Sequence, residues 1–343
     1  MKKPFLKSKK VKPKKIGVGE EKLVTTRFLD EGATLPLVVE PKVSDLDHLA
    51  WLAEESDWVE KMLYRHGAIL FRGFTVDKPR EFEAFASILT SGLYGNYGDL
   101  PPAEGKVYGV TPYPPEGTIL FHNESSHMHQ WPMKQFFYCD IPASKGGETP
   151  IADCRAIYKA LDPKLIALLE NKKLRYVRNF IKGVDVSWQD FFKTEDRAEV
   201  EARCAREGMV YSWKGEDELM TYQIAPAVIR HPVTKESVFF NQIMLHHASC
   251  LDGELGEAMS RMYALEDMPR NVFLGDGEVL DDAIVKEIVA QYWSLSKQFT
   301  WQHGDILMVD NMLVSHARNP YEPPRKMYVA MGNIIKSNEL AKV

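Results

Sequence analysis

Apolar residues recur along the chain at two spacings, and each spacing predicts a different kind of element. Between residues 46 and 64 they fall three or four positions apart, which is typical of a helix with one buried face. Residues 68–74, AILFRGF, form a short, almost unbroken apolar run that predicts a buried strand. Further helices are predicted after Asp77 and after Asp162, because an aspartate before an apolar helical pattern is a common helix start, and over residues 281–293.

Most of the other apolar runs are short and predict strands. They cover residues 117–122, 134–141, 174–180, 237–243, 298–302, 304–311 and 326–335. The stretch 92–117 is rich in Gly, Pro and Tyr and predicts a loop, and the charged and aromatic stretch 184–222 resembles an insertion. Strands at both ends with helices between them favour a mainly β fold, an antiparallel sandwich with helical insertions. We expect residues 21–343 to form a single domain.

Composition and charge exclude several classes of protein. The chain has 343 residues, of which 45% are hydrophobic and 27% charged, a profile typical of a globular protein with a sizeable core. A net charge of −5 argues against nucleic acid as a partner. No apolar run reaches about 18 residues, so we expect no membrane-spanning helix. The four cysteines are scattered without a CxxC pair, which fits a reducing cytoplasm.

The first residues are strongly basic. MKKPFLKSKKVKPKK carries eight lysines among fifteen residues and lacks the apolar centre of a signal peptide. We expect residues 1–20 to be a disordered, solvated tail, and electrostatic docking to an acidic partner is the alternative.

The stretch FHNESSHMHQW, residues 121–131, gathers three histidines and a glutamate. His122 and Glu124 follow the apolar run TILF, and residues two apart on a strand point to the same face, so both side chains can bind one cation. A second histidine must come from elsewhere. His316 is the best candidate, because a Gly-Asp turn and an apolar strand deliver it to a loop edge. An antiparallel sandwich can bring such distant segments side by side.

Two imidazoles and one carboxylate on one face form the facial triad of non-haem Fe(II) oxygenases, which leaves coordination positions open for a cosubstrate and O₂. Zinc could occupy the same ligands, but zinc does no oxygen chemistry. An HxE pair alone is a weak signal. HxE followed by a GD turn, an apolar strand, a DN pair, His316 and Arg325 is a far more specific combination. No GxGxxG or GxxxxGK[ST] motif supports a nucleotide-binding alternative.

These motifs resemble the Fe(II)/2-oxoglutarate dioxygenases related to taurine dioxygenase and clavaminate synthase. The resemblance rests on HNE at 122–124, GGETPIADCRAIYKAL at 146–161, WQHGDILMVDN at 301–311, His316 and Arg325. Within that superfamily, FHNESSHMHQWPMKQFFYC is similar to the syringomycin-type amino-acid β-hydroxylases. The family commonly has HxD, whereas this chain has HxE, as the clavaminate synthase branch does.

The resemblance implies a double-stranded β-helix, or jelly-roll, core and a set of site residues. His122, Glu124 and His316 would bind Fe(II). The cosubstrate 2-oxoglutarate would chelate the iron through its 2-oxo acid end, and its far carboxylate would meet Arg325 and the hydroxyl of Thr149. A guanidinium suits this role because it grips a carboxylate through two parallel hydrogen bonds.

Three further residues, Ser126, His127 and Arg318, are candidate substrate contacts. The alternatives are that His127 and His129 are ordinary loop histidines. Arg318 competes with Arg325 for the cosubstrate role and could instead meet an anionic substrate.

Several other polar and aromatic residues are expected to be structural. Adjacent histidines on a regular element cannot face the same metal, so we expect His246 and His247 to be structural. The remaining expectations are turn or strand-end roles for Asp305 and Asn311 and core positions for Trp131 and Trp301.

The resemblance also implies the reaction. We expect a cytoplasmic hydroxylase that consumes 2-oxoglutarate and O₂ and oxidises an unactivated carbon of a small acid. The favoured substrate is an amino acid of secondary metabolism, free or bound to a peptidyl carrier protein, hydroxylated at its β carbon. Alternatives are desaturation or cyclisation, action on a phosphonate or other small acid, or a silent jelly-roll that regulates or binds a partner. No membrane partner is expected, and an oligomer is compatible with these expectations.

Overall fold

The computed structural model describes residues 23–44, 46–95, 102–110, 112–215, 217–251 and 253–340 of the 343-residue chain. The lysine-rich segment that the sequence predicts to be a disordered tail lies outside the described residues. Within the described part of the chain, no helix is both long enough and apolar enough to cross a membrane.

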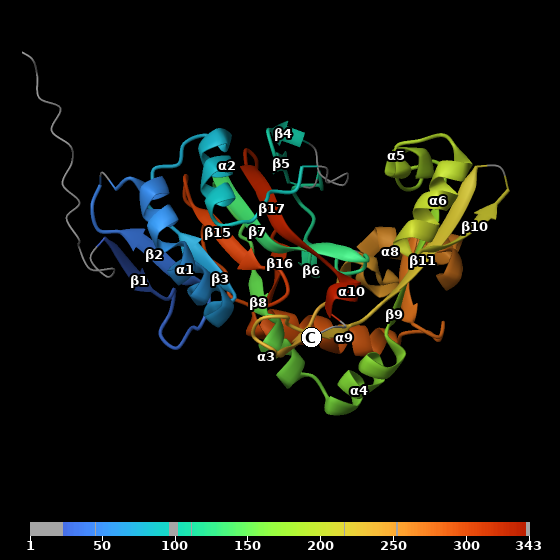
Figure 1. The fold of residues 1–343 in the computed structure, drawn as a ribbon. Coiled ribbons are helices and arrows are strands. Elements are labelled where there is room, and N and C mark those ends of the chain that lie inside the picture. Colours follow the sequence, from blue (N-terminus) through green and yellow to red (C-terminus); the bar gives the residue numbers. More distant parts are fainter. Residues whose placement is uncertain are drawn as a thin grey trace, which may run out of the picture.

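Two sheets packed on each other form the core (Figure 1). The larger sheet has the order β1-β2-β3-β15-β7-β17-β5-β4, and the smaller has the order β6-β16-β8. The larger sheet consists of β1 (Val24–Arg27), β2 (Leu37–Pro41), β3 (Ala68–Phe71), β4 (Pro102–Glu104), β5 (Val107–Gly109), β7 (Gln130–Ile141), β15 (Ile306–Asp310) and β17 (Lys326–Lys336). The smaller consists of β6 (Ile119–His122), β8 (Ile151–Asp153) and β16 (Val314–Arg318).

Two more sheets and the helices complete the described structure. The third sheet has the order β10-β11-β9-β14, and β12 pairs with β13. These strands are β9 (Leu174–Phe180), β10 (Val210–Lys214), β11 (Glu218–Ala225), β12 (Val228–Arg230), β13 (Ser237–Phe239) and β14 (Arg270–Leu274). The helices are α1 (His48–His66), α2 (Pro79–Ile88), α3 (Cys154–Ala160), α4 (Pro163–Lys172), α5 (Trp188–Phe192), α6 (Arg197–Glu207), α7 (Ile243–His246), α8 (Gly253–Met262), α9 (Asp282–Leu295) and α10 (Ser337–Leu340).

The larger sheet is covered on both faces. Successive residues of a strand point to opposite faces, so Ile69 and Phe71 pack against α1 and α2, while Ala68 and Leu70 face the smaller sheet. A strand with two apolar faces reads as a continuous apolar run, which is why residues 68–71 lack the polar alternation of a surface strand. This architecture is the jelly-roll core that the resemblance implies, with helical insertions around it.

Many sequence expectations are confirmed. The helices predicted over residues 46–64, after Asp162 and over residues 281–293 are present as α1, α4 and α9, and Asp162 caps α4 as expected. Asp47 and Asp281, for which no cap was predicted, cap α1 and α9 in the same way, by accepting a backbone N–H in the first turn. The prediction that Asp77 caps α2 is wrong: Lys78 occupies the cap position without a side-chain hydrogen bond, and the Asp77 N–H instead donates to Glu81. Trp131 and Trp301 are buried, as expected.

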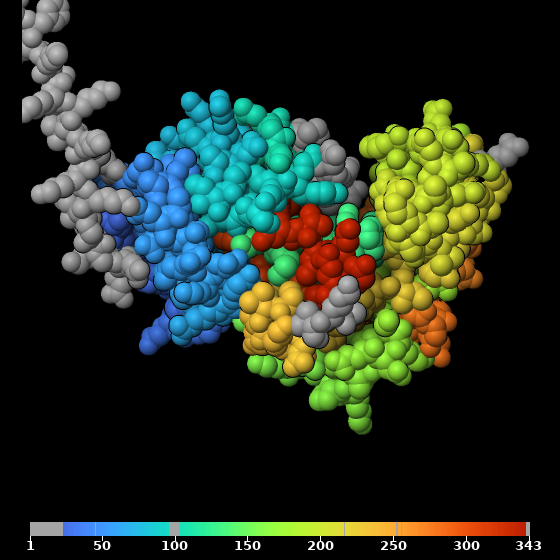
Figure 2. All heavy atoms as spheres, in the orientation of Figure 1, coloured from blue at the N-terminus to red at the C-terminus, as the bar shows by residue number. Residues whose placement is uncertain are grey.

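Three stretches differ from their predictions. Residues 102–109, predicted as loop, form the β4–β5 hairpin at an edge of the larger sheet. Residues 298–302, predicted as a strand, belong to none. The stretch 184–222 is more than an insertion, because β11 pairs with β9 along its whole length and completes the third sheet. The helices α5 and α6 of that stretch form the projecting lobe seen in Figure 2.

Candidate metal centre

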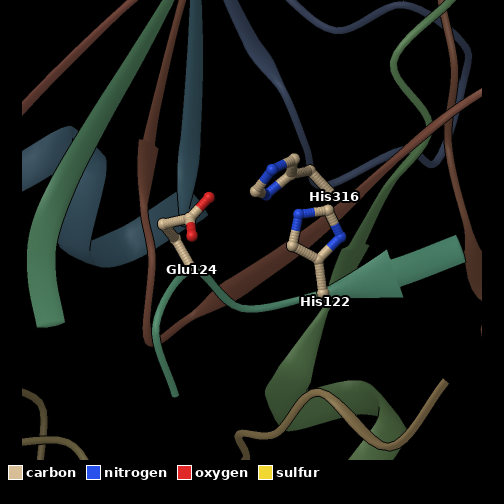
Figure 3. Close-up of side chains that lie close together, drawn as sticks. All are labelled: His122, Glu124 and His316. Atoms are coloured by element: carbon tan, nitrogen blue, oxygen red, sulfur yellow. The ribbon is translucent and has the colours of Figure 1, made fainter. Parts of the chain in front are cut away.

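Two strands far apart in sequence bring the predicted metal ligands together. Strand β16 pairs with β6 in antiparallel register, and His316 is the direct partner of His122. The two imidazole rings lie 4.2 Å apart between centroids. One ligand atom from each of His122, Glu124 and His316 lies within 4.8 Å of the others, and Figure 3 shows the three side chains converging. The expected triad therefore assembles, but His316 lies in the middle of β16 and not at a loop edge.

The surroundings of both histidines suit metal binding. The His122 Nδ1 lies 2.9 Å from the carbonyl oxygen of Leu120, so Nδ1 carries the hydrogen and Nε2 keeps its lone pair for a cation. His316 is buried, and burial together with the nearby His122 holds its pKa well below the usual range. A metal ligand must be deprotonated, so this environment favours metal binding over protonation.

Glu124 reaches the site in a different way from that predicted. Strand β6 ends at His122, and Glu124 lies in the following turn, so the two-residue strand period does not place it. The Asn311 side chain holds it instead. Asn311 Oδ1 accepts the Glu124 N–H at 2.7 Å, and Nδ2 donates at 2.9 Å to the Glu124 carbonyl. A further bond from Nδ2 to Pro132 ties the turn to β7.

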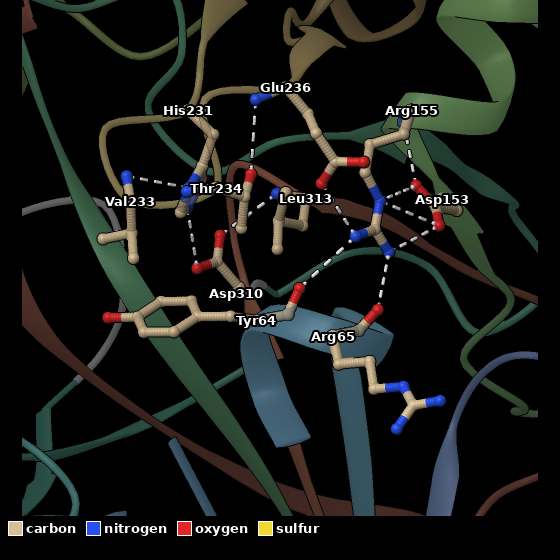
Figure 4. Close-up of polar contacts among 10 residues, drawn as sticks. All are labelled: Tyr64, Arg65, Asp153, Arg155, His231, Val233, Thr234, Glu236, Asp310 and Leu313. Carbon is tan, nitrogen blue, oxygen red and sulfur yellow. Dashed lines mark hydrogen bonds and ion pairs between the residues drawn. The ribbon is translucent and has the colours of Figure 1, made fainter. Parts of the chain in front are cut away.

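A buried network fixes the turn between β15 and β16 (Figure 4). Asp310 accepts the backbone N–H groups of Met312 and Leu313 through Oδ1, while Oδ2 accepts from Nε2 of His231 at 3.1 Å. The Nδ1 of His231 in turn accepts two backbone N–H groups, from Val233 and Thr234, which places the ring hydrogen on Nε2. This turn leads directly into the strand that carries His316.

A second part of that network pins the neighbouring strand. Arg155 binds the Asp153 carboxylate at the end of β8 and donates to the Tyr64 and Arg65 carbonyls at the end of α1. Since β8 pairs with β16, these bonds tie the metal-binding strand to the helical layer behind the larger sheet. Glu236 completes the network as a further acceptor for Arg155.

Arg325 lies at the entrance to β17 and is mostly buried. Its Nε donates to the Gly147 carbonyl at 3.1 Å, and no carboxylate of the described residues forms an ion pair with it. Burial, aided by the positive charge of Arg318, lowers the pKa of Arg325 to about 10. A buried guanidinium without a counter-ion is costly, and a carboxylate of a ligand would relieve that cost.

The GGET turn is shaped around this arginine. Gly147 has a φ of +75°, and a Cβ there would lie 2.9 Å from Cδ of Arg325. The Thr149 hydroxyl is buried and accepts a hydrogen bond from the Trp301 indole at 3.2 Å. Because its oxygen is used as an acceptor there, the Thr149 hydroxyl hydrogen stays available for an acceptor in the site.

The two predicted roles of Arg318 can be compared with its contacts. Its terminal nitrogens donate to the carbonyls of Tyr113, Pro114 and Gly117 at 3.1, 2.6 and 2.6 Å. The head of Arg318 thus holds the 113–117 loop, while its Nε is buried without a partner in the described structure. Arg325 is the better placed of the two arginines for a cosubstrate carboxylate.

The predicted substrate residue His127 lies in a small cluster. Its ring centroid is 4.8 Å from that of His246 and 5.7 Å from that of Tyr176. Ser126 is buried, and its hydroxyl has no partner among the described residues. His247 is structural, as expected, because both its nitrogens are engaged by Ser249 and Leu280.

Sequence reasoning missed two supports of the candidate site. The hydrogen bonds of Asn311 to Glu124 and of His231 to Asp310 connect residues that are 187 and 79 positions apart in the chain, so no local pattern could reveal them. The DN pair that follows the apolar strand was the one available signal for Asn311. His246 lies against His127, with ring centroids 4.8 Å apart, and its structural role stays a prediction.

The geometry fits iron chemistry. Two imidazoles and one carboxylate suit Fe(II), and Arg325, which has no ion-pair partner among the described residues, suits the far carboxylate of a chelating 2-oxo acid. A jelly-roll core with this site defines a non-haem iron oxygenase. The model of the family described as taurine catabolism dioxygenase TauD, TfdA family matches residues 32–331, and the chain belongs to this family. It is accordingly a dioxygenase that uses Fe(II) and 2-oxoglutarate.

Known proteins place the chain further. It is 36% identical over 277 residues to the dapdiamide synthesis protein DdaC of Enterobacter agglomerans, covering 80% of this chain and 84% of that protein. A taurine dioxygenase from Burkholderia xenovorans has a similar structure, with a TM-score of 0.55 at 15% identity over 92% of each chain. The structure of AAD-2 in complex with Mn(II) and N-oxalylglycine gives a TM-score of 0.53 at 17% identity, over 90% of this chain and 96% of AAD-2.

Proposed function

We propose that this enzyme hydroxylates an unactivated carbon of a small acid, namely the β carbon of an amino acid, free or bound to a peptidyl carrier protein, in secondary metabolism. The observation that carries the proposal is the convergence of the Glu124 carboxylate with both histidines, together with an Arg325 that has no ion-pair partner among the described residues. The similarity to a dapdiamide synthesis protein supports secondary metabolism as the context.

Each site residue has a proposed task. Iron with bound 2-oxoglutarate supplies the oxidising chemistry. His122, Glu124 and His316 hold the metal, and Arg325 with Thr149 holds the far carboxylate of the cosubstrate. Ser126 and His127 contact the substrate. Arg318 contributes to substrate binding through the 113–117 loop that it holds and through its Nε, which has no other partner in the described structure. The buried surroundings of these residues exclude water from the reacting carbon.

The proposal extends to the whole chain. Residues 21–343 act as one oxygenase domain in the cytoplasm, and the lysines of segment 1–20 carry the charge for electrostatic docking to an acidic partner such as a carrier protein. The enzyme acts as a monomer or as a small oligomer.

Cosubstrate binding can be tested without knowing the substrate. Anaerobic titration of the protein with Fe(II) and 2-oxoglutarate should produce a weak visible charge-transfer band. His122→Ala and His316→Ala should abolish the band and weaken Fe(II) binding while circular dichroism stays that of the native fold. A protein that gives no band is a silent jelly-roll, and a variant that keeps a normal band refutes the assignment of that histidine.

The substrate class is tested by succinate release. A screen of free amino acids, carrier-loaded amino acids and small phosphonates should give coupled turnover only with the amino-acid classes. Mass spectrometry of the product then separates the reaction types, since hydroxylation adds one oxygen atom and desaturation removes two hydrogens. Coupled turnover with phosphonates alone would contradict the proposal.

A further inference from the structure

One face of the third sheet carries polar residues where an apolar face is expected. Tyr176 and Arg178 of β9 point to this face, and so do their register partners Gln223 and Thr221 of β11 and Arg270 of β14. We call these five residues the polar band. Tyr176 contacts the rings of His127 and His246, so the band begins next to the turn that carries Glu124.

Tyr176 belongs to one apolar cluster, and the other four residues of the band lie between that cluster and a second one. On one side, Leu174 and Val272 belong to the core that contains Phe121. On the other side, Phe180 and Leu219 pack against the α5 and α6 segment. The polar residues in between occupy the sheet face where these two clusters would otherwise meet.

Two arginines lie directly opposite each other within the band. Arg270 is the register partner of Arg178, and like charges placed opposite each other across strands are destabilising. Both arginines pair with the carboxylate of Asp185, at 3.0 Å from Arg270 and 3.4 Å from Arg178. Their positive charge extends to the metal side of the sheet, because after burial the largest influences that lower the pKa of His127 to about 3 are Arg270 and Arg178.

Some buried hydrogen-bond donors in and near the band have no acceptor among the described residues. The Nε2 of Gln223 and the hydroxyl of Ser126 have no hydrogen-bond partner in the described part of the chain. Both residues are buried, with exposed fractions of 8% and 2%. The Tyr176 oxygen accepts from the Gln242 N–H at 3.0 Å, which leaves its own hydrogen to donate. A buried donor left unsatisfied is costly, so this set of donors calls for a ligand group that only accepts.

We propose that Arg270, together with Tyr176 and Gln223 in the next cross-strand row of the same sheet face, binds a carboxylate of the substrate at the end remote from the carbon that is oxidised. A carboxylate accepts hydrogen bonds through both oxygens and carries the charge that complements a guanidinium. The inference rests on the proposed function and narrows the substrate to molecules with a free carboxylate that reaches from the iron to the third sheet.

The test compares acids with their methyl esters. Protein loaded anaerobically with Fe(II) and 2-oxoglutarate is titrated calorimetrically with the common amino acids, their N-acetyl derivatives and the methyl ester of each. The wild type should bind at least one acid more tightly than its ester. In Arg270→Gln the acid should bind roughly tenfold to a hundredfold more weakly, with the ester unchanged.

Two further variants separate binding from structure. Arg175→Gln is the matched control, because Arg175 lies on the same strand β9 but on the opposite face, where it stacks on Tyr222. This variant should prefer the acid over the ester as the wild type does. Asp185→Asn breaks the Arg270–Asp185 ion pair that Arg270→Gln also breaks, and the Arg178–Asp185 pair in addition, but it leaves both positive charges, so it should tighten acid binding. A merely structural network would change the preference in the same direction in both variants.

The outcomes distinguish this inference from the proposed function. If the wild type gives no charge-transfer band with Fe(II) and 2-oxoglutarate, the proposed function fails. If the band forms but no acid binds more tightly than its ester, or Arg270→Gln keeps the wild-type preference, the carboxylate subsite is overturned and the proposed function stands. The same holds if Asp185→Asn loses the preference together with Arg270→Gln.

Discussion

At the scale of single residues, replacing Arg325 should have the largest effect on the requirement for 2-oxoglutarate. Removing one partner of a buried ion pair costs roughly 3–5 kcal/mol. Each 1.4 kcal/mol is about tenfold in affinity, so Arg325→Ala should raise the 2-oxoglutarate requirement by about two to three orders of magnitude. Arg325→Lys should recover only part of the lost 2-oxoglutarate affinity, because an ammonium keeps the positive charge but cannot form the two parallel hydrogen bonds of a guanidinium. Fe(II) affinity should change little. Steady-state succinate release at varied 2-oxoglutarate measures the effect.

Arg318→Ala is the control for this experiment. Its terminal nitrogens bind the 113–117 loop, so the variant should leave the cosubstrate requirement nearly intact and act, if at all, on the substrate. The two arginine roles would have to be exchanged if Arg318→Ala gave the large 2-oxoglutarate defect and Arg325→Ala gave almost none.

Glu124 predicts the type of oxidation. Halogenases of the superfamily that this chain resembles have Gly or Ala at the position of Glu124, which opens an iron position to chloride. Here a carboxylate converges with both histidines, so that position is filled. The wild-type enzyme in chloride buffer should give a hydroxylated and not a chlorinated product. Mass spectrometry distinguishes the two products, because a chlorinated product shows the chlorine isotope pattern. Detection of that pattern would contradict the prediction.

At the scale of elements, the turn between β15 and β16 sets the position of the metal ligands. Asn311→Ala removes both bonds to the Glu124 backbone and the bond to Pro132. Loss of groups that orient metal ligands typically lowers metal affinity by about 10- to 100-fold, so we expect Fe(II) affinity to fall by that factor. Anaerobic titration with Fe(II) measures the decrease.

Asn179→Ala serves as the matched control for that variant. Asn179 is also a buried asparagine with two backbone acceptors, Glu266 and Met268, but it lies in the third sheet away from the triad. Its loss should lower the melting temperature without changing Fe(II) affinity. Equal Fe(II) affinities in the two variants would show that Asn311 only stabilises the fold.

At the scale of the whole molecule, the site joins segments that are distant in sequence. The ligands come from β6, the turn after it and β16, and the cosubstrate residues come from the GGET turn and the start of β17. They meet only in the folded chain, so bound metal and cosubstrate should stabilise it by about 2.7 kcal/mol at a hundredfold excess over Kd.

Thermal unfolding measures this linkage. Fe(II) with 2-oxoglutarate should raise the melting temperature of the anaerobic wild type, and removal of the metal by a chelator should lower it again. His316→Ala should show no such shift, because it lacks one of the ligands. A shift of equal size in that variant would place the stabilising site elsewhere.

The sequence by itself determined the element types and the chemistry of the site. Period and capping residues located α1, α4, α9 and β9 closely, because those signals are local. The residue types and order of HxE, His316 and Arg325 predicted the candidate ligand set, since metal and carboxylate binding depend on side-chain chemistry, and His122, Glu124 and His316 do converge. Local signals failed at Asp77, where Lys78 occupies the cap position of α2 and the Asp77 N–H donates to Glu81, and at residues 298–302, which join no strand.

Only the tertiary structure decided how the ligands are held. It placed His316 opposite His122 in a strand pair, moved Glu124 into a turn held by Asn311, and joined β11 to β9. It also set Arg270 opposite Arg178 on a sheet face near the iron ligands. Each of these relations joins residues through hydrogen bonds or register across long sequence separations, and a pattern read along the chain carries no information about such pairings.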